Sequence, residues 1–243
     1  MARTCLGLIA LALAAMLAGP VLAKGETVVF NEGLGGGKHG FSAVIAALAG
    51  EVPVYYQPRP AHMAGDEDGH RSPSDVARDL RRRLDAAGIA PPYIMVGHSI
   101  GGSYALAFAK LYPNEVTGLL LIDPRLPSYT PLCFAEGQIL CDITPLGLLK
   151  RPESERLEYA GLQDDLGLLS DASDLGALPV TVLGSTVPPK GVPQDWQNFW
   201  LDYLRAFSRT AANDRFIAVP GAPHMIQNAR PDLVTEEIRR LLR

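Results

Sequence analysis

A serine set between two glycines, in the turn from a strand-like run to a helix-like run, constrains the fold of this chain most. Residues 93–96 form a short apolar run that predicts a buried strand, and residues 104–111 carry the apolar side chains of a helix. Ser99 stands in the turn, with Gly97 two positions before it and Gly101 two positions after it. Because glycine has no Cβ, the strand and the helix can approach closely there. The pattern therefore predicts a sharp turn that raises the serine hydroxyl above the sheet edge, at the positive end of a helix.

Length and composition fit one domain with a sizeable core. The chain has 243 residues, of which 47% are hydrophobic, and this excludes an intrinsically disordered protein. The formal net charge of −4 argues against a nucleic-acid partner, since proteins that bind nucleic acids carry basic surfaces. The sequence has no internal repeat, which argues against a solenoid.

Strand-like and helix-like segments alternate along most of the chain. The expected strands are residues 27–30, 52–56, 93–96, 118–122, 178–183 and 216–219. The expected helices are residues 41–48, a helix capped by Ser74 with Val76, Leu80 and Leu84 on one face, the helix after Ser99, residues 196–207, and a helix that begins at Pro231. Alternation of this kind predicts an α/β fold with a mainly parallel sheet flanked by helices.

The first 23 residues have the pattern of a signal peptide. Arg3 gives a positive start, residues 6–17 form an apolar core of 12 residues, and residues 21–23 fit a cleavage site before Lys24. The apolar core is too short to span a bilayer comfortably. We expect an exported protein, periplasmic or secreted, and an uncleaved membrane anchor is the alternative.

Two cysteines remain after the predicted cleavage. Cys133 and Cys141 lie eight positions apart in a polar, loop-like segment. In an oxidising compartment they can close a small ring, so export predicts a disulfide between them. The alternative is a pair of free, buried thiols.

A segment of more than fifty residues interrupts the alternation of strands and helices. Residues 124–177 contain no clear strand and are punctuated by prolines. A segment this long is uncommon as a simple connection, so we expect a lid or cap over the site. Its leucines, Leu146, Leu148 and Leu149, either face an apolar pocket or bury the cap on the sheet.

Three further motifs accompany the serine turn. They are Phe-Asn-Glu-Gly-Leu-Gly-Gly at residues 30–36, Leu-Ile-Asp-Pro at residues 121–124 and Pro-His-Met at residues 223–225. Together they resemble the α/β-hydrolase superfamily, in its small single-domain esterase/lipase-like branch. The first motif is similar to the H-G-x-G-type oxyanion loop of that family. The resemblance implies one α/β-hydrolase domain over residues 24–243, with a cap insertion at about 124–177 that no matched motif covers.

A serine hydroxyl is a poor nucleophile until a base removes its proton, and His224 is the best candidate for that base. It follows the last expected strand and precedes the final helix, which places it on the same rim of the sheet as Ser99. His98 is adjacent to the serine, but neighbouring residues of a turn point apart, and the family uses this position for packing. The remaining histidines lie in polar loops, where we expect them to be solvated: His39, His62 and His70.

The carboxylate that orients the imidazole has two candidates. Many relatives place this acid after the strand that corresponds to residues 178–183, but residues 184–189 contain none. The first carboxylate beyond them is Asp195, which can equally serve the N-terminus of its own helix. Asp123 directly ends the strand after the serine helix, a position that some relatives use, although Arg125 can compete for it. We favour Asp123 because its strand and Pro124 hold it rigidly.

An oxyanion hole needs two backbone N–H groups aimed at the developing charge. Ile100 follows the nucleophile and supplies one, and the resemblance implies Leu34 for the other. Glu32 stands where the family has histidine, so the support of this loop must differ. The loop lacks the Gly-Lys-Ser/Thr ending of a P-loop, which argues against phosphate binding.

An acidic cluster at residues 66–70 lacks the remaining ligands of a calcium loop, so we expect a solvated loop and no metal site. The chain is thus predicted to be an exported serine hydrolase, most simply a carboxylic-ester hydrolase with a Ser99, His224 and Asp123 triad. We expect a small-molecule ester or acyl substrate, no cofactor, no nucleic acid and no stable membrane span after signal cleavage. An amidase, a lactonase or a non-catalytic binding module on the same fold is the alternative.

Overall fold

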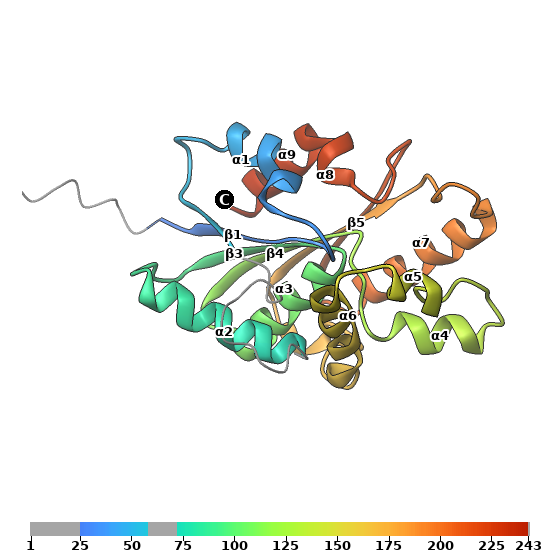
Figure 1. Cartoon of the computed structure of the whole chain (residues 1–243). Coiled ribbons are helices and arrows are strands. Elements are labelled where there is room, and N and C mark those ends of the chain that lie inside the picture. Colours follow the sequence, from blue (N-terminus) through green and yellow to red (C-terminus); the bar gives the residue numbers. More distant parts are fainter. Residues whose placement is uncertain (1–24, 58–71, 243) are drawn as a thin grey trace, which may run out of the picture.

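The computed structural model describes residues 25–57 and 72–242, in which a parallel sheet lies between two layers of helices (Figure 1). The predicted signal peptide, His62, His70 and the acidic cluster at residues 66–70 lie outside the described residues.

The sheet has six strands in the order β2-β1-β3-β4-β5-β6, and every neighbouring pair is parallel. The strands are β1 (Thr27–Asn31), β2 (Val54–Tyr56), β3 (Tyr93–His98), β4 (Val116–Ile122), β5 (Pro179–Ser185) and β6 (Asn213–Val219). All six lie where the apolar runs predict them, and the predicted α/β fold is confirmed. The register pairs His98 with Ile122 and Ile122 with Leu183, so the carboxyl ends of β3, β4 and β5 lie side by side.

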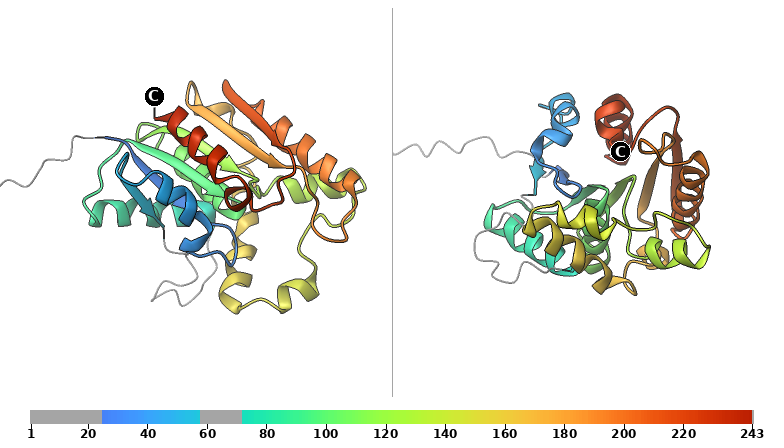
Figure 2. Two further views of the ribbon diagram at one scale, coloured as in Figure 1. Left: turned by 90° about the horizontal axis from the view of Figure 1, so that it is seen from above. Right: turned by 45° about the vertical axis from the view of Figure 1, so that its right-hand side comes forward.

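Each face of the sheet has its own core. One face is covered by α1 (Ser42–Ala47), α8 (Ile226–Ala229) and α9 (Pro231–Leu241), and the other by α2 (Pro73–Ala86), α3 (Ile100–Leu111) and α7 (Gln194–Ser208) (Figures 1 and 2). Adjacent residues of a strand point to opposite faces. Val29 and Met95 therefore pack against the second set of helices, whereas Phe30 and Val96 pack against the first. The continuous apolar runs of the central strands follow from burial on both sides.

The N-terminus of α2 corrects one prediction. The capping residue is Ser72 and not Ser74, because the Ser72 hydroxyl accepts the backbone N–H of Asp75 at 3.2 Å and Pro73 takes the first helical position. Ser74 lies inside the first turn, and its own N–H donates to Asp165 at 2.6 Å. A residue 91 positions away thus helps to cap this helix.

The insertion between β4 and β5 (residues 124–177) is helical. It contains α4 (Tyr129–Ala135), α5 (Pro145–Leu149), α6 (Glu153–Ala160) and two short 3₁₀ helices, Gly161–Asp165 and Ser173–Leu175. A further 3₁₀ turn, Lys38–Phe41, precedes α1. Leu162 anchors the insertion, packing against Val76 of α2 and against Ile100 and Tyr104 of α3. Cys133 and Cys141 are joined by a disulfide in the structure, with Cα atoms 5.4 Å apart.

The leucines of the insertion were expected either to face an apolar pocket or to bury the insertion on the sheet, and for two of the three both expectations are wrong. Leu146 and Leu149 are 63% and 67% exposed, so they neither anchor the insertion on the sheet nor face a pocket. The helix α5 is only five residues long and has no buried residue, which explains why its apolar positions carry no packing information. No helix within the described residues is long and apolar enough to cross a membrane.

Candidate active site

The candidate site lies at the edge where the carboxyl ends of the parallel strands meet. β3 is followed by Ser99 and β4 by Asp123, while β5 ends at Ser185. β6 is followed by the turn that carries His224. Ligand sites of parallel α/β sheets form at this edge, because loops from several strands converge there.

Ser99 occupies a strained backbone conformation, with φ 53° and ψ −126°. Steric clashes make this conformation costly for a residue with a side chain, and such outliers concentrate at functional sites. The predicted role of the glycines is confirmed: a Cβ on Gly97 would lie 2.3 Å from the carbonyl oxygen of Gly101, and one on Gly101 would lie 2.3 Å from that of Asn31. The close approach holds the serine in the turn, at the first residues of α3.

His224 is hydrogen-bonded to Asp123. The His224 Nδ1 and Asp123 Oδ2 atoms are 2.6 Å apart, and the imidazole is 45% exposed while the carboxylate is buried. An ionised carboxylate only accepts hydrogen bonds, so Nδ1 donates its proton to Asp123, and in the neutral imidazole this leaves Nε2 with a free lone pair. No hydrogen bond joins Ser99 to His224 in residues 25–57 and 72–242, but both line the same cavity. Catalytic hydrogen bonds are often long in free enzymes and shorten when substrate binds.

Three more donors surround the Asp123 carboxylate. Oδ1 accepts the Ser185 backbone N–H at 2.8 Å and the Trp200 indole N–H at 2.9 Å, and Oδ2 accepts the Ser185 hydroxyl at 2.8 Å. Burial raises the pKa of Asp123, but the hydrogen bond and positive charge of His224, with the donors from Ser185 and Trp200, outweigh it and hold the pKa below its usual range. Asp123 is therefore a stable anion in a buried place.

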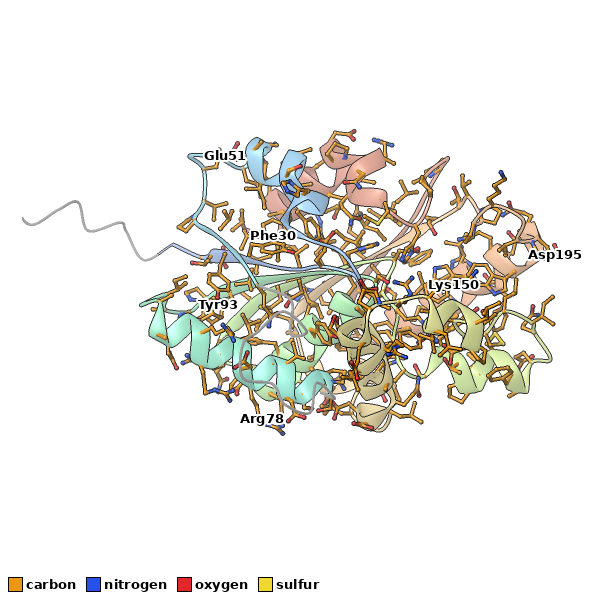
Figure 3. The ribbon with its side chains drawn as sticks, in the orientation of Figure 1. Phe30, Glu51, Arg78, Tyr93, Lys150 and Asp195 are labelled. Carbon is orange, nitrogen blue, oxygen red and sulfur yellow. A yellow bond between two sulfur atoms is a disulfide. The ribbon has the colours of Figure 1, made fainter. Side chains whose placement is uncertain are left out.

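The competing groups lie elsewhere. Arg125 turns away from Asp123 and donates to the Thr130 hydroxyl, the Cys141 carbonyl and the Tyr159 hydroxyl. Asp195 is exposed in the first turn of α7, at the outer end of that helix (Figure 3), and it does not line the cavity that holds His224. Of the two carboxylates weighed from the sequence, the structure brings only Asp123 to His224.

The glycine loop after β1 lies against the serine turn. A Cβ on Gly33 would lie 3.0 Å from the Ser99 Cβ, and Leu34 and Ile100 both line the cavity. The backbone N–H of Ile100 opens α3 and has no acceptor within its own helix. Glu32 is buried beneath the loop, where its carboxyl group packs against the Cα atoms of Gly36 and Gly40. Any side chain at those two glycines would overlap Glu32, so the loop and this glutamate fit closely together.

The cavity around Ser99 and His224 has a volume of about 640 Å³, which suits a small organic molecule. Its wall on the α7 side is aromatic, with Tyr129, Trp196 and Trp200. Burial raises the pKa of Tyr129 to about 12, so this phenol is neutral near neutral pH. Leu34 of the glycine loop and residues of the insertion also line the cavity.

Sequence reasoning missed the residues that hold Asp123. Ser185 ends β5 at the position where many relatives keep their acid, and that position was a usable signal. Trp200 belongs to the apolar face of α7, a segment whose sequence predicts a helix and no role at the site. Its indole N–H reaches an acid 77 residues away, and helical periodicity carries no information about such a contact. His98 packs as expected, buried with its Nε2 3.1 Å from the His224 carbonyl oxygen.

Metal-binding side chains do not gather at this site. Within the part of the chain that the structure describes, no group of three or more His, Cys, Asp or Glu residues is placed to hold a metal ion.

Comparison with known proteins identifies relatives of this fold. The model of the alpha/beta hydrolase fold family matches residues 26–139. Uncharacterized protein YqjL of Bacillus subtilis (strain 168) is 24% identical over 87% of this chain and 81% of its own length. A thermophilic esterase from Thermogutta terrifontis superposes with a TM-score of 0.62 at 19% identity, covering 90% of this chain and 89% of its own. The enol-lactonase from Burkholderia xenovorans LB400 superposes with a TM-score of 0.64 at 16% identity, covering 90% and 91%. The chain thus has the α/β-hydrolase fold, and just under half of it, residues 26–139, matches the model of that family.

Proposed function

We propose that this protein is an exported serine hydrolase of the small esterase/lipase-like branch, which cleaves carboxylic esters through an acyl-enzyme. The observation that carries the proposal is the arrangement around one cavity. A serine in a strained turn and a histidine hydrogen-bonded to a buried aspartate line it together. These are the three roles that acyl transfer by serine requires: nucleophile, base and orienting acid.

In the proposed reaction, Ser99 attacks the ester carbonyl carbon while His224 takes the hydroxyl proton at Nε2. The imidazolium then returns this proton to the departing alcohol, and Ser99 keeps the acyl group as an ester. Water deprotonated by His224 attacks the acyl-enzyme, and the acid leaves as Ser99 recovers its proton. Asp123 holds the Nδ1–H tautomer throughout and stabilises the charged imidazole in both halves.

The backbone N–H groups of Leu34 and Ile100 bind the oxyanion in this proposal. Support comes from the contact of the glycine loop with the serine turn and from the position of Ile100 at the start of α3, where the helix dipole favours negative charge. Both donors belong to the backbone, so the departure from the family pattern at Glu32 leaves them in place. Neither donor needs a cofactor.

Export rests on the N-terminal pattern and on the two cysteines of the insertion. Residues 1–23 have the charge, apolar core and cleavage site of a signal peptide. Disulfides persist in oxidising compartments, so a bond between Cys133 and Cys141 fits a periplasmic or secreted enzyme.

The decisive experiment compares Ser99→Ala with Ser103→Ala in the mature protein. Ser103 lies one turn further along α3 and donates to the Arg125 carbonyl, so its variant makes the same chemical change outside the proposed machinery. We expect Ser99→Ala to lower hydrolysis of p-nitrophenyl esters by roughly 10⁴-fold or more and to abolish labelling by a fluorophosphonate probe. Ser103→Ala should still be labelled.

Two results would count against the proposal. Unchanged ester hydrolysis by a folded Ser99→Ala variant removes Ser99 from the mechanism. A wild-type protein that the probe does not label is instead a non-catalytic module with a hydrolase fold. A series of esters with increasing acyl length then identifies the chain length that the cavity accepts.

A further inference from the structure

Trp200 belongs to two parts of the molecule at once. Its ring forms part of the aromatic wall of the cavity, and its indole N–H donates to Asp123 Oδ1 at 2.9 Å. The side chain is almost fully buried, with 5% of its surface exposed. Buried polar groups are nearly always hydrogen-bonded, and leaving the indole N–H without an acceptor would be costly, so the folded chain keeps this contact.

Four hydrogen-bond donors restrain the orientation of the Asp123 carboxylate. Oδ1 accepts from the Ser185 N–H and the Trp200 indole, while Oδ2 accepts from the Ser185 hydroxyl and from His224. Each oxygen therefore has two donors, and a turn of the carboxylate breaks bonds on both sides. Without the Trp200 indole, the Ser185 backbone N–H is the one donor that Oδ1 keeps.

Gln197 determines the direction of the Ser185 hydroxyl. Its Nε2 lies 2.6 Å from the Ser185 carbonyl oxygen and 3.1 Å from the Ser185 Oγ. An amide nitrogen only donates, so Oγ accepts this bond and its single proton goes to Asp123. One turn of α7 thus presents both Trp200 and Gln197 to the network that holds the acid.

We propose that Trp200 is a positioning residue for Asp123, which ties the aromatic wall of the cavity to the orientation of His224. The wall is a packed unit: Trp196 stacks on Trp200 with ring centres 6.0 Å apart, and Tyr129 meets Trp200 edge-on at 4.6 Å. A substrate group that presses on this wall acts on the ring that holds the acid. The inference rests on the proposed function, because positioning matters only if His224 works as the base.

The direction of the effect on pH dependence follows from charge. The indole N–H withdraws negative charge from the Asp123 carboxylate, so its removal leaves more charge facing the imidazole and stabilises the protonated base. The acid limb of kcat/KM, which reports that protonation in the free enzyme, then moves to higher pH. A purely structural loss lowers activity without this movement. The other ionisable groups lining the cavity stay the same in all the proteins compared: Glu32, His98, Arg125, Tyr129, Asp142, Arg151 and Tyr159.

The chain allows an atom-level test, because it contains only two tryptophans. In a Trp196→Phe background, growth of a tryptophan auxotroph with β-(3-benzothienyl)alanine replaces Trp200 alone. This analogue keeps the two-ring shape and exchanges the N–H for sulfur. The reference is the Trp196→Phe protein with ordinary tryptophan at residue 200, so both proteins have the same altered wall.

We expect the analogue to lower kcat by about tenfold, the loss of one hydrogen bond to a charged group. The acid limb should move to higher pH, and KM should stay within about twofold, since the ring surface that meets substrate is kept. Trp200→Phe, checked by circular dichroism, is the second variant and should show the same displacement of the acid limb. If kcat and the acid limb are the same in the analogue and the reference, the positioning role is refuted.

A change in KM alone also refutes it, since Trp200 is then a wall residue only. These results are distinguishable from failure of the proposed function. That failure appears as a reference protein that a fluorophosphonate does not label, or as activity that survives Ser99→Ala. A labelled, active reference whose analogue form keeps its acid limb contradicts only the role of Trp200.

Discussion

Asp123 combines a strained backbone with a fully occupied carboxylate. Its φ of 45° lies in the left-handed region, and the residue is 1% exposed. Its N–H donates to the Leu183 carbonyl at 2.7 Å, which holds the strained residue between β4 and β5. An exposed carboxylate such as Asp195 is not enclosed in this way, and positional tolerance in catalysis is small.

The first prediction at this scale compares two amide substitutions. We expect Asp123→Asn to lower kcat by roughly 10⁴-fold, because an amide holds the imidazole in the wrong tautomer. Asp195→Asn should cost roughly 0.3–1 kcal/mol of stability at the N-terminus of α7 and leave kcat near wild type. Steady-state kinetics on both proteins, with folding checked by circular dichroism, decides between them. The opposite order of kcat would assign the acid to Asp195.

The second prediction concerns stability at low pH. The pKa of Asp123 is lowered in the folded protein, so folding favours the ionised carboxylate. The stability that it contributes is fully present above its ordinary pKa of 3.8 and is lost as pH falls through the lower folded value. Urea unfolding at pH 6 and pH 3 should therefore show a larger loss for wild type than for Asp123→Asn. Equal losses would mean that the carboxylate carries no such linkage.

Local pattern identified Ser99 and His224 as the candidate nucleophile and base, but it did not reveal what surrounds them. Ser99 and His224 are recognisable because a turn motif and the position after a strand are local features of the chain. Asp123 was favoured over Asp195 by an argument from rigidity, and the contact with His224 agrees with that preference. The sequence did not reveal the roles of Trp200 and Gln197. These roles depend on contacts with Asp123 and Ser185, which come together only when distant segments of the chain pack.

At the scale of elements, the insertion builds one wall of the cavity from a short covalent ring. The loop between Cys133 and Cys141 ends next to Asp142, which pairs with Arg125 at 3.5 Å. The Arg125 guanidinium also donates to the Cys141 carbonyl and lies 4.9 Å from the centre of the Tyr129 ring. The position of this wall therefore depends on where the ring holds Cys141.

The third prediction follows for the two cysteines. In the exported protein we expect reduction to add two hydrogens to the mass of the peptide that carries both cysteines. Replacing both by serine should raise KM several-fold and change kcat by less than about twofold, since Ser99, His224 and Asp123 lie on other elements. Alkylation of both thiols without prior reduction would contradict the disulfide.

The start of a helix was predictable where residues next to it in the sequence determine it. It was not predictable where a distant residue contributes to the cap. Pro231 begins α9 as predicted, because proline suits the first helical position. The start of α2 was misplaced by two residues, since the choice between Ser72 and Ser74 depends partly on Asp165. The exposed leucines of α5 show the same limit: apolar character predicts burial only when an element is long enough to have two faces.

At the scale of the whole molecule, the signal-peptide pattern of residues 1–23 predicts that the protein is exported. The fourth prediction is that the mature protein begins at Lys24. Mass spectrometry of the protein from the periplasm or the culture medium should find this N-terminus. A protein that keeps residues 1–23 and sediments with membranes would instead be anchored.

The position of the acid after β4 has a consequence for how this architecture can change. Ser99 and Asp123 close the two strands of a single β3–α3–β4 unit, and the insertion starts only after Asp123. The insertion can therefore be exchanged as a unit. The exchange would replace the wall of the cavity that the insertion builds, while the sheet keeps the backbone of Ser99 and Asp123 in place. Its downstream junction meets β5 and α7, which carry Ser185 and Trp200. A foreign insertion is compatible with this scaffold when it leaves Trp200 in contact with the acid.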